Sequence, residues 1–168
     1  MQQIPREITL FLQKLDILVA DCSSGCNKEQ CEKIKKFIEE NASDLPYQEI
    51  IPEPKDGKNY GRLQLGIGER SGLELVLVQI PEGEKIQCHT HCGWAVVKVL
   101  EGVEENRFFK DILGAWQPTG DIEIYKAGDI AVLEDRSIAH EIVAPKRSVS
   151  LHVYCQPQDK LCGAGFID

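Results

Sequence analysis

The chain has 168 residues, a formal net charge of -8 at pH 7 and a pI of about 5.1. This length suits one domain with a buried core, and the acidic balance excludes a nucleic-acid binder, which needs a basic face. No apolar run approaches the roughly 20 residues that cross a bilayer. The N-terminal stretch lacks the features of a secretory signal, and seven cysteines, an odd count, indicate a reducing compartment. We therefore expect a cytoplasmic protein that contacts no membrane.

Two helices are predicted before the strands begin. The first covers residues 6–21, just after Pro5. The second runs from about Lys28 to Glu40, and Asn27 can cap its start. Both carry an apolar stripe at helical spacing that we expect to pack on the core. The stripes consist of Ile8, Phe11, Leu12, Leu15 and Leu18 in the first helix, and of Cys31, Ile34, Phe37 and Ile38 in the second.

From Tyr60 onward, short runs rich in β-branched and aromatic residues are separated by turn residues. The runs are RLQLGI, LELVLVQI, KIQCHTH, WAVVKVL, ENRFF, IEIYKA, DIAVLE, SIAHEIVA and SVSLHVY, and the breaks include ERSG, PEGE, EG, PTGD and AGD. Many short strands at this spacing predict an all-β sandwich or barrel. We expect a single domain over residues 1–168, with a helical segment at 1–43, a Pro-containing connector at 44–59 and a β-barrel at 60–168.

The chain has only four histidines, and all of them lie within the predicted barrel. His89 and His91 are one residue apart in a run that reads as a strand, so both imidazoles should point to the same side. Gly83, five residues, His, any residue and His match the first half of the cupin metal motif. His140 lies in GDIAVLEDRSIAHEIV, which resembles the second half. We predict a divalent metal held by these three histidines rather than ordinary core or surface histidines, with coordination positions left for water, O2 or substrate.

The predicted site lacks an acidic ligand. Most metal cupins add a Glu a few residues after the second histidine, but that position falls near Ala95 and residues 92–99 contain no acid. Three neutral histidines would leave an Fe(II) ion with its full charge of 2+. Such a centre favours an anionic ligand, for example a thiolate.

Four segments, in order, make the chain resemble cysteine dioxygenase, the thiol dioxygenase branch of the cupins. The match covers residues 60 to about 162. The segments are Tyr60-Gly61-Arg62, similar to the family's Tyr-x-Arg; His89-Thr90-His91 followed by Val-Leu-Glu-Gly, similar to its HxH segment; residues 135–140, DRSIAH, similar to its third-ligand segment; and Ser150-Leu151-His152-Val153-Tyr154, similar to its Ser-x-His-x-Tyr strand. The last segment is the most specific, because HxH alone is common to all cupins.

The resemblance implies a mainly β fold, the cupin double-stranded β-helix or jelly-roll barrel, with N-terminal helices. It implies an enzyme that uses Fe(II), held by His89, His91 and His140, to oxidise L-cysteine with O2 to cysteine sulfinic acid. The expected partners are then a small thiol and O2, with no nucleic acid and no membrane, and the protein is expected to be a monomer or a weak homodimer.

The resemblance also implies roles for residues around the iron. Arg62, with Tyr60 beside it, would bind the substrate carboxylate through two parallel hydrogen bonds. The alternative for Arg62 is a surface charge on a strand. Ser150 and His152 would orient the hydroxyl of Tyr154, which would bond the oxygen or the substrate. Periodicity alone leaves open whether these three side chains face the barrel interior or solvent, because Val149, Leu151 and Val153 alternate with them.

One departure from the family separates its branches. Animal members join a Cys to the active-site Tyr by a thioether, and the equivalent position here falls near Ala95, or at Gly93 or Trp94. None of these is Cys, so the chain resembles a bacterial-type member, and we predict no cross-link.

Three other functions stay open. One is a 3-mercaptopropionate or other small-thiol dioxygenase, although that branch usually has Gln where Arg62 stands. Another is a metal cupin of different chemistry. The last is a non-catalytic cupin that binds a metal or ligand.

Overall fold

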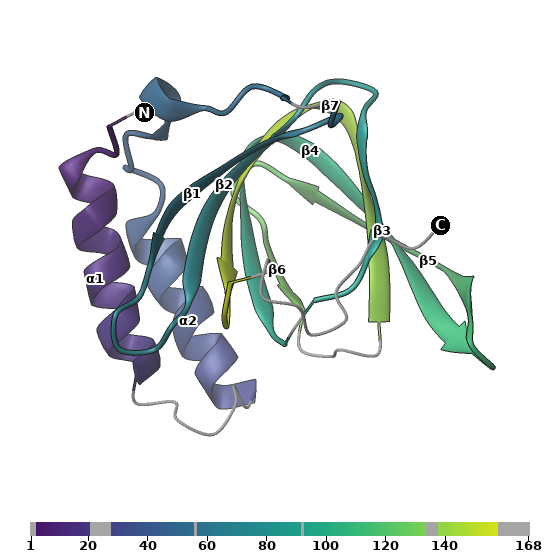
Figure 1. The fold of residues 1–168 in the computed structure, drawn as a ribbon, viewed down its shortest axis with the longest axis horizontal. Coiled ribbons are helices and arrows are strands. Elements are labelled where there is room, and N and C mark those ends of the chain that lie inside the picture. The colour runs from purple at the N-terminus through teal and green to yellow at the C-terminus, as the bar shows by residue number, and fades with distance from the viewer. Residues whose placement is uncertain (1–2, 21–27, 56, 92, 134–137, 158–168) are drawn as a thin grey trace.

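The computed structural model describes residues 3–20, 28–55, 57–91, 93–133 and 138–157. Two helices and a short 3-10 turn precede the strands: α1 (Arg6–Ala20), α2 (Lys28–Asn41), η1 (Tyr47–Ile50), β1 (Gly61–Ile67), β2 (Glu74–Ile80), β3 (Lys85–His89), β4 (Ala95–Ile112), β5 (Ala115–Lys126), β6 (Ile130–Leu133) and β7 (Ile138–Tyr154) (Figure 1). The predicted mainly β class with N-terminal helices is confirmed. The predicted cap Asn27 and residues 135–137 of the third-ligand segment lie outside the described residues. No helix in the described part of the chain is long and apolar enough to cross a membrane.

The two helices cover one face of the sheet through the stripes that the sequence predicts (Figure 1). Their buried side chains form one cluster with strand residues that include Leu75, Leu77 and Leu151. Each fully buried aliphatic side chain stabilises the fold by about 1.5–3 kcal/mol. Asp16 of α1 is also buried, and it accepts hydrogen bonds from the backbone N–H groups of Arg70 and Ser71 and from the Ser71 hydroxyl. This carboxylate therefore attaches α1 to the turn between β1 and β2.

All strands belong to one antiparallel sheet, with the order β1-β2-β7-β4-β5, β3 paired with β7 and β6 paired with β4. The long strands β4 and β7 pair with each other along most of their length. Residues 148–154 of β7 pair with β2, while residues 140–143 pair with β3. Side chains from both parts meet in a second cluster, the barrel interior: Val76, Val78, Ile80, Ile86, Ala95, Ile142, Ala144 and Tyr154. The sheet therefore curls around an interior that the helices do not reach.

Three breaks predicted from turn residues are bends inside strands. WAVVKVL and ENRFF form one strand, β4, and SIAHEIVA and SVSLHVY form another, β7. Gly102, at the EG break, has a φ of 78°, and a Cβ there would lie 1.9 Å from the carbonyl oxygen of Arg147. The register of β4 against β7 shifts three times around this glycine. The PTGD break is a bulge in β5, where residues 119–121 lie opposite Phe108. Glycine and bulges permit such bends without ending the strand.

The curled sheet decides which way the last part of β7 faces. Val149, Leu151 and Val153 belong to the cluster under the helices, whereas Tyr154 belongs to the barrel interior. Because side chains alternate along a strand, Ser150 and His152 face the interior with Tyr154. Neither face is open to solvent, and all three polar side chains are buried.

Candidate metal centre

Three histidines converge at one end of the barrel interior. His89 is the last residue of β3, His91 follows that strand, and His140 is near the start of β7. Their ligand nitrogens all lie within 4.8 Å of one another, and in the described part of the chain these three residues form the group able to hold a metal ion. The expectation that both residues of the HxH pair lie on one strand is wrong, because β3 ends at His89.

A β-bulge turns His89 toward the interior. Ile86 pairs with Ile142 and His89 pairs with His140, so two residues of β3 lie opposite one residue of β7. Ile86 belongs to the barrel interior. In a regular strand, His89 would point to the opposite face from Ile86, three positions earlier. The bulge removes this alternation and brings His89 to the same side as His140.

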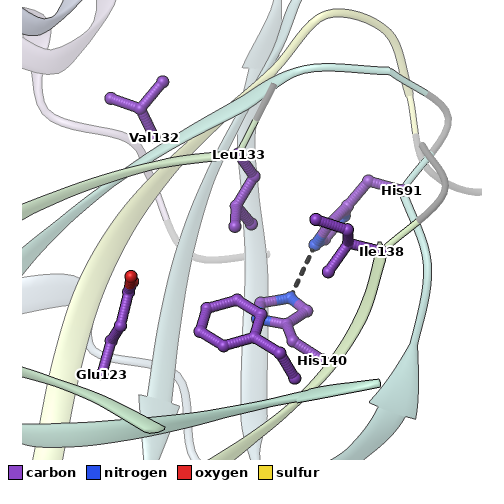
Figure 2. A pocket seen from close by; sticks show the side chains of 7 residues that line it. His91, Glu123, Val132, Leu133, Ile138 and His140 are labelled. Carbon is purple, nitrogen blue, oxygen red and sulfur yellow. Dashed lines mark hydrogen bonds between the residues drawn. The ribbon is translucent and has the colours of Figure 1, made fainter. Parts of the chain in front are cut away.

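Hydrogen bonds to the outer ring nitrogens orient two of the imidazoles. His140 Nδ1 lies 2.7 Å from Asn106 Oδ1, and His89 Nδ1 lies 2.8 Å from the carbonyl oxygen of Gln87. Both partners are acceptors, so each Nδ1 donates its proton and each Nε2 keeps a lone pair. His91 Nε2 lies 2.8 Å from His140 Nε2 (Figure 2). The three histidines therefore present Nε2 atoms toward a common point.

This donor set fits a divalent transition metal. Two imidazole nitrogens at about 2.1 Å from one ion, at right angles, would be roughly 3 Å apart, which is close to the His91–His140 separation. Burial and the neighbouring imidazoles hold the pKa of His140 well below its usual range, so its ring stays neutral, the state that binds metal. Imidazole suits iron, zinc, copper and nickel, and three neutral ligands preserve the charge of the ion.

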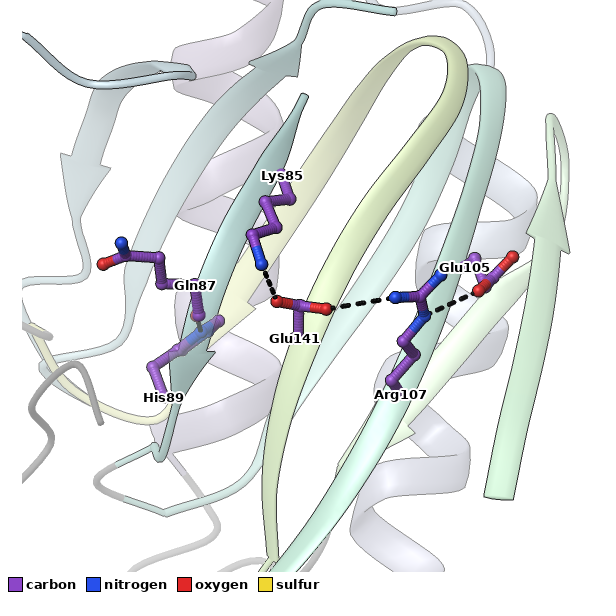
Figure 3. A network of polar contacts seen from close by, with 6 residues as sticks. All are labelled: Lys85, Gln87, His89, Glu105, Arg107 and Glu141. Atoms are coloured by element: carbon purple, nitrogen blue, oxygen red, sulfur yellow. Dashed lines mark hydrogen bonds and ion pairs between the residues drawn. The ribbon is translucent and has the colours of Figure 1, made fainter. Parts of the chain in front are cut away.

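Ion pairs on the outside of the barrel connect the strands that carry the ligands. Glu141, opposite the bulge, accepts from Lys85 Nζ at 2.5 Å and from Arg107 Nη1 at 3.5 Å (Figure 3). Arg107 also contacts Glu105 at 2.8 Å. These contacts cross from β3 to β7 to β4. Since Lys85 and Arg107 are about half exposed, the pairs contribute to strand alignment more than to stability.

A cavity of about 330 Å³ opens beside the histidines. Its volume suits a small molecule. It is lined by His91, Phe108, Glu123, Val132, Leu133, Ile138 and His140 (Figure 2). Two of the three candidate ligands thus border a space that a substrate could enter, with mainly apolar walls.

A hydrogen-bonded row of Ser150, His152 and Tyr154 lies next to this group. The hydroxyl oxygens of Ser150 and Tyr154 each lie 2.8 Å from a different ring nitrogen of His152. The ring of Tyr154 stacks on that of His91, with centroids 5.3 Å apart. Burial, followed by the charges of the neighbouring histidines and Arg62, lowers the pKa of His152 to about 3, so its ring is neutral. Burial raises the pKa of Tyr154, which keeps its proton.

Arg62 lies on the interior side of β1, and it already has a partner. Its Nη2 atom donates to Glu74 Oε1 at 2.6 Å, and Gln64 Nε2 donates to the same oxygen at 2.7 Å. Glu74 is fully buried, whereas about a third of the Arg62 side chain is exposed. Tyr60 packs against the interior cluster, and burial raises its pKa. Both predicted substrate residues therefore lie near Tyr154, with a carboxylate that the sequence analysis did not foresee.

The residue opposite Tyr154 on β4 is Ala95. Directly opposed residues in an antiparallel pair have Cβ atoms about 4.5–5.5 Å apart. A cysteine there could reach the tyrosine ring, but a methyl group cannot form a thioether.

Three polar residues of the interior are not predicted from the sequence: Asn106, Glu74 and Glu104. Glu74 and Asn106 lie in runs that read as ordinary strands, Glu104 lies between two such runs, and all three are buried. A polar residue in a strand indicates a functional role only when both faces of that strand are buried. The sequence does not show that β2 and β4 are buried on both faces, so these residues could not be singled out.

No protein-family model matches the chain, and no curated protein matches it in sequence. Solved structures match in fold. An RmlC-like cupin from Shewanella frigidimarina NCIMB 400 has a TM-score of 0.50 and 20% identity, covering 66% of this chain and 89% of that one. A cupin superfamily protein from Desulfitobacterium hafniense DCB-2 has a TM-score of 0.48 and 14% identity, covering 67% and 88%. KdgF from Halomonas sp. has a TM-score of 0.48 and 19% identity, covering 64% and 91%. At these identities the likeness concerns the fold alone. The match to the Shewanella structure, together with the seven-stranded antiparallel sheet and the two helices of the described residues, confirms the predicted cupin fold.

Proposed function

We propose that the protein is an Fe(II)-dependent thiol dioxygenase that oxidises L-cysteine with O2 to cysteine sulfinic acid. The observation that carries this proposal is the juxtaposition of two groups: three histidines without a carboxylate, and the row Ser150–His152–Tyr154 stacked against one of them. The all-histidine set leaves a charge of 2+ for an anionic thiolate to balance. The tyrosine, whose ring stacks on His91, would supply a hydroxyl to the substrate or the oxygen.

The reaction inserts both atoms of O2 into the substrate. The thiol sulfur loses four electrons, O2 gains them, and the two oxygen atoms end on sulfur as a sulfinate. Iron, when bound, would supply the binding and activation of O2 and of the thiolate. The protein positions the reactants and adjusts the charge around them.

The chain's own residues have separable tasks in this proposal. His89, His91 and His140 would hold the ion through Nε2, while Asn106 and the Gln87 carbonyl fix two of the rings. Tyr154 would hydrogen-bond the oxygen or the sulfur. Partly buried aliphatic side chains around the cavity, Val132, Leu133 and Ile138, would limit the access of water, which strengthens these polar contacts.

Arg62 is assigned to the substrate carboxylate. The guanidinium is planar and presents five N–H donors. Its Nη2 atom contacts Glu74. Glu74 and Gln64 thereby hold the guanidinium in one orientation. The N–H groups of Arg62 that do not contact Glu74 would bind the substrate carboxylate.

The test is an assay with reconstituted enzyme. Metal-free protein is loaded anaerobically with Fe(II), O2 and cysteine are added, and sulfinate and O2 loss are measured together. We expect one O2 consumed for each sulfinate formed. The matched control is His140→Ala, which removes one ligand and should abolish both iron retention and turnover.

Substrate comparison separates the alternatives. Turnover of 3-mercaptopropionate or cysteamine without turnover of cysteine would replace the assigned substrate and remove Arg62 from its role. Retention of iron with no oxidation of any thiol would instead favour a non-catalytic cupin. Cysteamine, which has no carboxylate, is included because Arg62 is already paired with Glu74. A guanidinium whose charge is balanced by Glu74 gains less from binding a substrate carboxylate.

A further inference from the structure

The barrel interior contains an acid, Glu104, that the proposed thiol chemistry does not use. It lies on β4, and only 1% of its surface is exposed. The hydroxyl of Ser148 donates to its Oε1 atom at 3.2 Å, and the hydroxyl of Ser150 is close enough to lower the pKa of the carboxyl group. A buried carboxyl group without a cation is uncommon, because burial disfavours its charged form.

Glu104 extends the row of hydrogen bonds beside the histidines. Glu104 is hydrogen-bonded to Ser148, which lies on the same face of β7 as Ser150. Ser150 contacts His152, and His152 contacts Tyr154. These side chains lie in a row, which we call the path: Glu104, Ser150, His152 and Tyr154, whose ring stacks on His91. All four side chains are buried, so hydrogen bonds in the path are not exchanged for water.

The proton on Glu104 decides the direction of every bond in this path. An ionised carboxylate only accepts, so Ser150 would donate to it, His152 would donate from Nε2 to Ser150, and the Tyr154 hydroxyl would donate back to Nδ1. A neutral carboxylic acid can donate to Ser150. Ser150 then donates to Nε2, and Nδ1–H donates to the Tyr154 oxygen. Only in this second case does the hydroxyl of Tyr154 point its own proton away from His152.

The surroundings of Glu104 favour the neutral acid. Burial is the largest influence on its pKa and raises it, and the hydroxyls of Ser150 and Ser148 offset this only in part. The nearest charged groups along the path act at its other end: Arg62 from β1 and Glu74 from β2 act on Tyr154 with opposite signs. Across from Glu104, β5 contributes Tyr125 in register; burial raises its pKa further above neutral, so its phenol carries no charge at pH 7.

We propose that Glu104 is a positioning residue that, as a neutral carboxylic acid, donates to Ser150 and so orients the Tyr154 hydroxyl as a hydrogen-bond donor toward the three histidines. The direction of the bonds is a property of the chain without metal. Only its consequence for turnover depends on the proposed dioxygenase function, where a donating hydroxyl would stabilise negative charge at the oxygen or the sulfur.

The first test measures the tautomer of His152 in the metal-free protein by nitrogen-15 NMR. We expect the Nδ1–H form in the wild type. The isosteric variant Glu104→Gln should keep this form, because its amide N–H replaces the acid's O–H as donor to Ser150. Glu104→Leu should give a mixture of tautomers, since no group then fixes Ser150. An Nε2–H tautomer in the wild type, or an unchanged tautomer in folded Glu104→Leu, would overturn the proposal.

Infrared spectroscopy checks the proton directly and does not require Glu104→Leu to fold. At pH 7, the wild type should show a protonated carboxyl band that is missing in Glu104→Gln. The band should remain in the control Asp16→Asn, which changes a different buried acid. No such band in the wild type would mean that Glu104 is ionised and the proposal is wrong.

The kinetic test applies once turnover is established. Glu104→Leu should lower kcat by about tenfold or more, with little change in KM for the thiol, because positioning of a proton donor acts on the chemical step. Glu104→Gln should stay within about threefold of the wild type. In a Tyr154→Phe background, Glu104→Leu should have no further effect, as expected for residues that act through one another. If the losses of kcat in Tyr154→Phe and Glu104→Leu add in the double variant, the proposal is wrong. If the His152 tautomers are as expected but no thiol is oxidised, the dioxygenase function is wrong and the role of Glu104 stands.

Discussion

Tyr154 lies between two neighbours that define its chemistry, His152 at its hydroxyl and Ala95 across the strand pair. The hydroxyl is buried and its pKa is raised, so it acts as a neutral hydrogen-bonding group rather than a phenolate. In the family that the chain resembles, some members modify this tyrosine covalently. Here the residue opposite the tyrosine is Ala95, so we expect no such modification.

Ala95→Cys should therefore permit the thioether that the natural chain lacks. The cysteine would lie directly opposite Tyr154, within reach of its ring. Formation is oxidative, so we expect a mass lower by two hydrogen atoms only after incubation with Fe(II), O2 and thiol. The double variant Ala95→Cys/Tyr154→Phe is the control and should keep its full mass. If Ala95→Cys oxidises thiol but keeps its full mass, position 95 does not correspond to the cross-linking cysteine of the family.

Arg62 illustrates how a partner changes the interpretation of a substitution. Arg62→Ala removes the cation from Glu74, and an uncompensated buried charge costs about 3–5 kcal/mol. A loss of activity in that variant could come from weaker substrate binding or from a less stable fold. Arg62→Ala/Glu74→Gln removes both charges and separates the two effects.

For the double variant we expect a thermal midpoint near that of the wild type, a large rise in KM for cysteine, and unchanged iron content. The KM for cysteamine, which has no carboxylate, should change little. An equal KM for cysteine in wild type and double variant would remove Arg62 from the substrate site.

The stability of the metal-free protein should depend on pH through His152. Its pKa is about 3 in the folded chain and about 6.5 in an unfolded chain, so the unfolded chain takes up the proton first. The free energy of unfolding should be constant above pH 6.5 and fall below it, by up to about 1.4 kcal/mol per pH unit for this residue. Urea denaturation at pH 7.5, 6.5 and 5.5 measures the slope.

The matched variant for this measurement is His152→Gln, which should give a smaller slope over the same range. Glu104 acts in the opposite direction, because its raised pKa lets the folded chain take up that proton first. A slope that does not change in His152→Gln would mean that other groups control the acid sensitivity.

At the scale of elements, α1 depends on more than its apolar stripe. The carboxylate of Asp16 accepts three hydrogen bonds from the turn between β1 and β2. Hydrogen bonds to a charged group contribute about 1.5–3 kcal/mol each, although such contributions do not add fully. The helix is thus attached to the strand pair that carries Arg62 and Glu74.

Asp16→Ala should lower the free energy of unfolding by about 2–4 kcal/mol, as measured by urea denaturation. Metal binding per folded molecule should be unchanged, because the three histidines lie on the other side of the sheet from α1. Thr9→Ala, on an exposed position of the same helix, is the control and should change stability by less than about 0.5 kcal/mol. An equal effect of both variants would contradict the anchoring role of Asp16.

At the scale of the whole molecule, the metal site joins segments that are far apart in the chain. The ligands come from the end of β3, the segment after it and the start of β7, and the ring of His140 depends on Asn106 from β4. A ligand that binds only the folded chain stabilises it in proportion to occupancy. Metal binding should therefore hold these strands together.

Loading with Fe(II) under anaerobic conditions should raise the free energy of unfolding by about 2.7 kcal/mol when the free metal is 100 times its dissociation constant. A chelator should reverse the gain. His140→Ala should abolish it, and His152→Gln, which lies beside the site without being a ligand, should retain it. Equal stabilisation of all three proteins would show that the metal binds elsewhere.

The sequence by itself determined the features that depend on local periodicity: two amphipathic helices, most of the strands, the candidate ligands and the alternation of Ser150, His152 and Tyr154. It also supplied the cupin fold, through motifs of fixed spacing. Local patterns could not reveal that β4 and β7 run on through their bends, since a glycine in a turn and a glycine in a bend look alike in sequence.

Only the tertiary structure decided what each polar side chain meets. It turned Ser150, His152 and Tyr154 toward the barrel interior, paired Arg62 with Glu74, placed Asn106 against His140 and placed Glu104 against Ser148. It also replaced simple alternation at His89 with a bulge. The physical reason is register: these contacts join strands distant in the chain, and a shift of one residue between strands would change every partner.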